Sequence, residues 1–92
     1  MGDIKLEEQA GRGAEARAIL DSPIYQEAMI ALRGELLGLF EQTKFKDHEE
    51  RDEIWRKLQI ASWFESYLSR IMTTGKLAEQ SLMTKVKSRF MR

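Results

Sequence analysis

The clearest helix signal lies in residues 21–40, which read DSPIYQEAMIALRGELLGLF. Ser22 can accept hydrogen bonds from the free N–H groups of a helix start, and Pro23 suits the first helical position because it lacks an N–H. Wound at about 100° per residue, the segment gathers one apolar stripe within an arc of about 120°. The stripe consists of Tyr25, Ala28, Met29, Leu32, Leu36, Leu39 and Phe40. We therefore predict a helix from Ser22 to about Thr43 that buries this side.

A second long helix is predicted after the connector Lys44-Phe45-Lys46, and so short a connector returns it antiparallel to the first. Asp47 and Glu50 have the spacing of a capping box, and Gly75 is a typical C-terminal stop. The main apolar stripe is Ile54, Leu58, Ala61, Phe64, Leu68, Ile71 and Met72. Residues 22–74 thus predict a long antiparallel helical hairpin that buries Leu32, Leu36, Leu58, Phe64 and Leu68.

Shorter helices are predicted on either side of this hairpin core. Gly11 and Gly13 each cost about 1 kcal/mol in a helix interior, so residues 1–13 are the candidate disordered part. Residues 77–92 predict a C-terminal helix with Ala78, Leu82, Val86 and Phe90 on one side and a basic tail. The expected fold class is all-α, as one helical domain over residues 1–92 that forms oligomers.

Charge is distributed unevenly along a chain whose net charge is zero. Residues 1–55 hold 13 acidic and 7 basic side chains, and residues 56–92 hold 2 acidic and 8 basic ones. One interpretation is that the charges complement the helix dipoles. The other is an electropositive C-terminal arm for nucleic acid or an acidic partner. There is no cysteine, no secretory signal pattern and no long apolar run, so we expect a cytoplasmic protein without a membrane span.

Residues that could carry catalysis are scarce. The single histidine, His48, lies in the acidic run from Asp47 to Glu53 and has no second histidine at the spacing that a zinc site needs. Glu50 and Glu53 could supply half of a magnesium site, but Glu65 and Glu79 stand alone. Carboxylates in the first turns of a helix stabilise it, which is the simpler explanation of the run. We expect no enzyme activity, no metal and no cofactor.

Small residues occupy one face of the first long helix. Ala31, Gly34 and Gly38 share that face, and small residues at this spacing allow two helix backbones to approach closely. We predict a packing role for them, with tolerated surface glycine as the alternative.

Apolar side chains on the second long helix extend beyond what one neighbouring helix covers. Ile60, Trp63 and Tyr67 widen its apolar arc to about 220°, and Trp55 lies on the opposite, mostly polar side. Exposed aromatic surface usually marks an interface, so these four are the candidate partner-binding residues. In the competing interpretation, the C-terminal helix folds back over Trp63 and completes a monomeric bundle.

Basic side chains surround the C-terminal end. Lys85, Lys87, Arg89 and Arg92 accompany Phe90, a mixture that phosphate contact and base stacking could use. They are the candidate nucleic-acid contacts, with a solubilising tail as the alternative.

Several segments resemble small proteins encoded by tailed bacteriophages and prophages. The resemblance rests on residues 13–20 and 22–28, on Asp47 followed by residues 50–55, and on residues 75–79, and it covers about residues 11–82. Such proteins lie among virion-structure and packaging genes and mostly lack an assigned activity, so the resemblance implies no site residues.

Together these observations predict a non-enzymatic phage-type helical protein that acts through protein–protein contacts in virion assembly. Its expected partner is a second copy of itself or another phage or host protein, and its expected location is the host cytoplasm or the virion. The alternatives are a nucleic-acid-binding accessory of DNA packaging and a phage inhibitor of a host protein.

Overall fold

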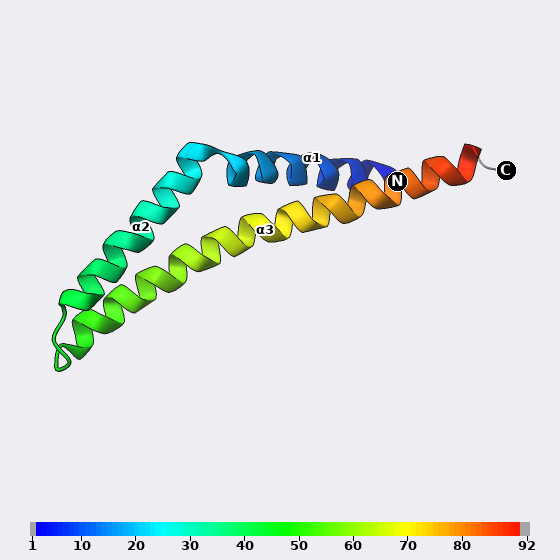
Figure 1. The fold of residues 1–92 in the computed structure, drawn as a ribbon. Helices are drawn as coiled ribbons and strands as arrows, with labels where there is room; N and C mark the ends of the chain where they lie inside the picture. Colours follow the sequence, from blue (N-terminus) through cyan, green and yellow to red (C-terminus); the bar gives the residue numbers. More distant parts are fainter. Residues whose placement is uncertain (1, 91–92) are drawn as a thin grey trace. The chain divides into compact units, whose positions relative to one another are not determined.

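The computed structural model describes residues 2–90, and every regular element in that range is an α-helix. The elements are α1 (Gly2–Asp21), α2 (Pro23–Gln42) and α3 (His48–Phe90) (Figure 1). They form two compact units. Unit 1 is the chain up to Leu20 together with Tyr67 onward, so that α1 pairs with the later part of α3. Unit 2 is Asp21–Ser66, in which α2 pairs with the earlier part of α3. The all-α prediction is confirmed.

The start of α2 follows the predicted signal. Ser22 accepts a hydrogen bond from the Tyr25 N–H at its side-chain oxygen (3.4 Å) and one from the Gln26 N–H at its carbonyl (3.0 Å). Pro23 occupies the first helical position. At the other end, the Thr43 hydroxyl and N–H both donate to the Phe40 carbonyl, at 2.6 and 3.1 Å, and complete the last turn.

The loop between α2 and α3 is closed by Asp47. Its N–H donates to the Lys44 carbonyl at 2.9 Å, and its carboxylate accepts from the Lys44 N–H at 3.0 Å. The Asp47 carbonyl accepts the first helical bond of α3, from the Arg51 N–H at 3.0 Å. Asp47 therefore stands at the helix start as predicted, but its side chain tightens the loop instead of forming a capping box with Glu50.

Gly75 is buried inside α3, so the prediction that it ends the helix is wrong. A Cβ atom at Gly75 would stand 2.6 Å from the Cα of Gly13 and 2.9 Å from the Gln9 carbonyl oxygen. The glycine is needed where two helix backbones touch, and nothing in its surroundings stops the helix. Residues 77–90 continue α3 and do not form a separate helix. Residues 2–13, which include the candidate disordered part, belong to α1.

The core of unit 1 is made of the smallest side chains. Gly13 and Ala16 of α1 and Gly75 and Ala78 of α3 are its buried residues among those described. The helices run antiparallel, because Gly13 meets Gly75 while Asp3, near the start of α1, meets Lys85 further along α3. Small residues let the backbones approach closely and gain dispersion energy from many atom pairs.

The core of unit 2 is an antiparallel helix pair. Its buried side chains are Met29, Leu36, Ile54 and Ala61. The rings of Tyr25 and Phe64 lie 6.5 Å apart at one end of the pair. At the other end, the Arg51 guanidinium lies over the Phe40 ring, 4.3 Å from its centre. The predicted hairpin is therefore present over residues 22–66, as α2 and the earlier part of α3.

Burial is less complete than the sequence pattern predicted. Leu36 is buried and Leu58 and Leu68 are half-buried, but Leu32 and Phe64 expose 42% and 47% of their surface. A helix stripe about 120° wide is covered only near its middle by a single neighbouring helix. Leu32 is turned about 60° from the buried Met29, and Phe64 about 60° from the buried Ala61, so unit 2 leaves both at its surface.

Candidate protein-binding surface

A hollow of about 390 Å³ lies between α2 and α3 in unit 2, and we call it the hairpin groove. Its lining is aliphatic and aromatic except for one lysine, and consists of Met29, Leu32, Leu36, Lys57, Ile60, Ala61 and Phe64. Met29, Leu36 and Ala61 form its floor because they are the buried residues of the helix pair. The more exposed side chains of Leu32, Ile60 and Phe64 form its walls.

The hairpin groove arises from the spacing of residues on the two helices. Leu32 and Phe64 directly precede Arg33 and Glu65, and neighbouring residues on a helix are turned about 100° from each other. Arg33 and Glu65 form an ion pair between α2 and α3, with each side chain about one-third exposed. The ion pair lies toward one side of the hairpin, and the apolar side chains emerge on the other.

Unit 2 exposes more large apolar side chains than it buries. Among the described residues it buries four hydrophobic side chains and exposes ten large ones. The exposed ones are Ile24, Ile30, Leu32, Leu37, Leu39, Phe45, Trp55, Ile60, Trp63 and Phe64. A single exposed leucine is ordinary, but a contiguous apolar patch usually marks a contact with another molecule. The walls of the hairpin groove form such a patch.

Of the four predicted interface residues, Ile60 lines the hairpin groove. Trp63 is 61% exposed and lies three positions further along α3, turned about 60° from Ile60. Trp55, 56% exposed, is turned about 140° from Ile60, so it is not brought to the groove. Tyr67 belongs to unit 1. The competing interpretation for Trp63 is wrong, since the segment expected to cover it continues the same helix.

Leu32 and Phe64 line the hairpin groove, but the sequence did not identify them as surface residues. Both fall within the apolar stripes, so the sequence pattern predicts that they are buried. No signal in the sequence distinguishes them, because the part of each stripe that is covered depends on how the two helices pair.

Tyr25 lies at one end of the helix pair in unit 2, and the pKa of its hydroxyl is raised. Its oxygen is buried and has no hydrogen-bond partner among the described residues. Burial raises the pKa of the Tyr25 hydroxyl, with a further increase from the nearby Glu65 carboxylate. The hydroxyl is thus kept neutral, and the aromatic ring contributes mainly through its contact with Phe64.

The basic residues of the C-terminal segment take different positions. Lys85 forms an ion pair with Asp3 at 2.5 Å, and Arg89 lies 3.8 Å from the same carboxylate. The hydrogen bond and charge of Lys85 lower the pKa of the Asp3 carboxyl, and Arg89 adds to this effect. Lys87 is exposed, and Arg92 lies outside the described residues. Two of the four candidate nucleic-acid contacts therefore hold α1 to α3.

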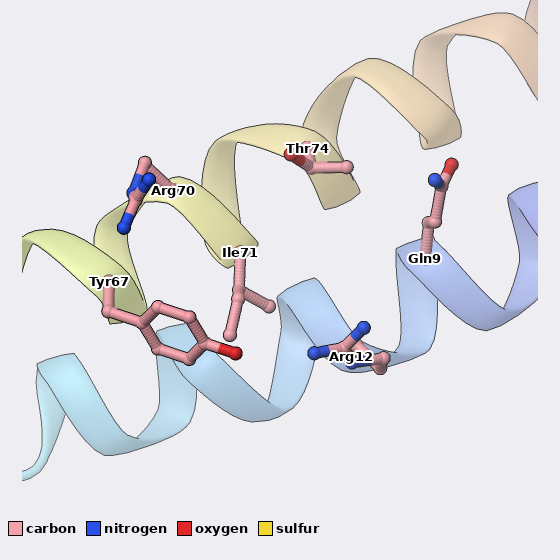
Figure 2. A pocket seen from close by; sticks show the side chains of 6 residues that line it. All are labelled: Gln9, Arg12, Tyr67, Arg70, Ile71 and Thr74. Atoms are coloured by element: carbon pink, nitrogen blue, oxygen red, sulfur yellow. The ribbon is translucent and has the colours of Figure 1, made fainter.

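A second hollow, of about 330 Å³, lies between α1 and α3 in unit 1, and we call it the polar groove. Its lining residues are Gln9, Arg12, Tyr67, Arg70, Ile71 and Thr74 (Figure 2). Figure 2 shows Tyr67 and Ile71 reaching from α3 toward α1, with Arg12 lying along α1. In contrast to the hairpin groove, most of these side chains are polar.

Other features of the described residues concern metals and membranes. No three histidine or carboxylate side chains in the described range converge on a point where an ion could bind. None of the described helices combines the length and apolar character needed to cross a bilayer.

The predicted small-residue face of α2 has no neighbour in the described structure. A Cβ atom on Gly34 or Gly38 would meet nothing within 4 Å. Within the described residues these glycines therefore contact no second helix, and a packing role between two copies stays a prediction. The close helix approach occurs instead at Gly13 and Gly75.

Comparisons with protein-family models, with curated proteins and with solved structures found no match for this chain.

Proposed function

We propose that the protein acts without catalysis, through protein–protein contacts, and that its first partner is a second copy of itself. In this arrangement two hairpin grooves face each other, and four helices surround a shared apolar core. Four-helix packing is the ordinary way in which helical hairpins cover an apolar face. The observation that carries the proposal is the exposed apolar wall formed by Leu32, Ile60 and Phe64.

The exposed area supports a partner of substantial size. The chain exposes 7557 Å², whereas a folded monomer of its 10.7 kDa mass exposes about 5,500 Å² by the usual scaling of area with mass. A standard protein–protein interface buries about 800 Å² on each partner, so the excess of roughly 2,000 Å² per chain is larger than one such interface needs. A second copy that covers the apolar wall would remove part of this excess.

Charge does not oppose self-association. The net charge of the chain is zero at pH 7, so two copies experience no overall repulsion. Lys57 is the single charged residue that lines the hairpin groove, and it lies 3.6 Å from Glu53 on the same helix. A partner that covers the hairpin groove therefore buries no unpaired charged side chain at the centre of the contact.

The setting that we propose for this contact is the assembly of a phage particle. It is supported by the resemblance of residues 11–82 to small tailed-phage proteins. A host protein could occupy the same groove if the chain were an inhibitor, and Trp63, beside Ile60 on α3, would then widen the contact. Self-association is favoured because the groove is already shaped by two antiparallel helices that a second hairpin can match.

The proposal is tested by sedimentation equilibrium of two matched variants. Ile60→Asp places a charge in the wall of the hairpin groove, and we expect it to weaken self-association by tenfold or more. Ile30→Asp makes the same change at a residue that is 73% exposed and turned about 160° from Leu32 on α2, so it should leave association unchanged. Equal effects of the two variants, or a monomeric wild-type protein, would contradict the proposal.

A further inference from the structure

The polar groove of unit 1 has a composition suited to an anion. Five of its six lining residues carry hydrogen-bond donors, namely Gln9, Arg12, Tyr67, Arg70 and Thr74. No carboxylate lines it. Two arginines, one from each helix, thus line a hollow that no carboxylate lines.

Neither arginine is neutralised within the described part of the chain. No carboxylate among the described residues lies within 4.0 Å of the Arg12 or the Arg70 guanidinium, although Arg33, Lys57, Lys85 and Arg89 all have such partners. Glu8 and Glu15 stand one turn to either side of Arg12 on α1, and neither lines the groove. Neither guanidinium is therefore engaged in an ion pair within the described residues.

The two arginines are displaced along the helix axes. Because Gly13 lies opposite Gly75, Arg12 is level with about residue 76 of α3, six residues from Arg70. At 1.5 Å per residue, the backbone positions of the two arginines are separated by about 9 Å along the helix axis. Such spacing suits two successive anionic groups along an extended chain better than one compact anion.

The lining continues as a polar face on both helices. Lys5, Gln9 and Arg12 recur at helical spacing on α1. On α3, Thr74, Ser81 and Ser88 follow one another at intervals of seven residues, which keeps them on one side of the helix. Hydroxyl, amide and arginine side chains are those that commonly contact phosphate oxygens.

Tyr67 supplies an aromatic surface at one end of the polar groove. The Arg70 guanidinium lies 5.7 Å from the centre of its ring. Aromatic rings next to arginine form the platforms on which single-stranded nucleic acids stack their bases. A polyglutamate chain carries no ring that could stack there.

From these observations we propose that the polar groove binds the phosphodiester backbone of single-stranded nucleic acid. Arg12 and Arg70 contact successive phosphates, and Tyr67 stacks against a base. Net charge favours this ligand, since unit 1 contains nine basic and five acidic residues. The activity is independent of self-association, which uses residues of unit 2.

The test is fluorescence anisotropy of labelled oligothymidylate with the full-length chain. Binding should weaken with salt, and the slope of log K against log salt should fall in magnitude by about 0.7 for each phosphate contact removed. Arg12→Gln and Arg70→Gln should each lower affinity at least threefold, and Tyr67→Leu about fivefold. Arg56→Gln is the matched control, because it removes the same charge from an exposed position of α3 in unit 2.

Three results would overturn the proposal. The first is no binding at about 50 mM salt, where phosphate contacts are strong. The second is an equal loss of affinity in Arg56→Gln, which would show that only overall charge matters. The third is equally strong binding of polyglutamate, which would show that the groove is a binding site for acidic peptides. Circular dichroism of each variant shows whether its helices remain intact.

Discussion

Gly13 and Gly75 illustrate how the lack of a Cβ atom in glycine sets the distance between two paired helices. A Cβ atom at Gly13 would stand 2.6 Å from the Gly75 Cα and 3.2 Å from the Ile71 carbonyl oxygen. These neighbours are backbone atoms, so no side-chain rotation can make room. Sequence alone did not identify this contact, because a glycine within a helical pattern can equally signal a helix end or a close approach.

We predict that Gly13→Ala destabilises α1 although alanine is the better helix former. Overpacking of a tight contact costs about 1–3 kcal/mol, and the helices of unit 1 must separate to admit the methyl group. Gly11→Ala is the control, since nothing lies within 4 Å of its added Cβ atom, and it should gain up to about 1 kcal/mol. Thermal unfolding followed by circular dichroism and amide exchange in α1 gives both values. Stabilisation by both substitutions would show that the glycine contact is not present.

At the scale of elements, the sequence predicted helix starts better than helix ends or partners. Ser22 and Pro23 begin α2 as expected, because capping is a local interaction. The extent of α3 was missed, since its continuation past Gly75 depends on α1, which lies far away in the sequence. Leu32 and Phe64 were misplaced for the same reason, because an apolar stripe does not reveal how many helices cover it.

We predict that the contact between the start of α1 and the later part of α3 is sensitive to acid. Because Lys85 lowers the pKa of the Asp3 carboxyl below its ordinary value of 3.8, the folded state favours the ionised form. The ion pair therefore stabilises unit 1 above pH 3.8 and is lost as the pH falls through the lowered pKa. An NMR titration of the Asp3 carboxyl should show the depression.

Two lysine variants identify the cause of this shift. Lys85→Gln should return the pKa of Asp3 toward 3.8, because it removes the hydrogen bond and the nearest charge. Lys87→Gln removes the same charge from an exposed residue that is turned about 200° further along α3, and it should leave the pKa of Asp3 nearly unchanged. An ordinary Asp3 pKa in the wild-type protein would argue against the α1–α3 pairing itself.

At the scale of the whole molecule, the candidate surfaces divide between the two units. Unit 2 has ten acidic and six basic residues and carries the apolar hairpin groove. Unit 1 has the opposite charge balance and carries the polar groove. The sequence revealed the charge gradient and the exposed Ile60 and Trp63. It could not reveal either groove, because each requires side chains from two helices.

Self-association through the hairpin groove is best tested by the molar mass of the wild-type chain in solution. Light scattering over a range of concentrations should approach twice the 10.7 kDa of one chain as concentration rises, because burial of the hairpin groove favours the pair of hairpins. The melting temperature should rise with concentration over the same range, since association stabilises the folded state by mass action. A mass of 10.7 kDa and a constant melting temperature at every concentration would show that the chain does not self-associate.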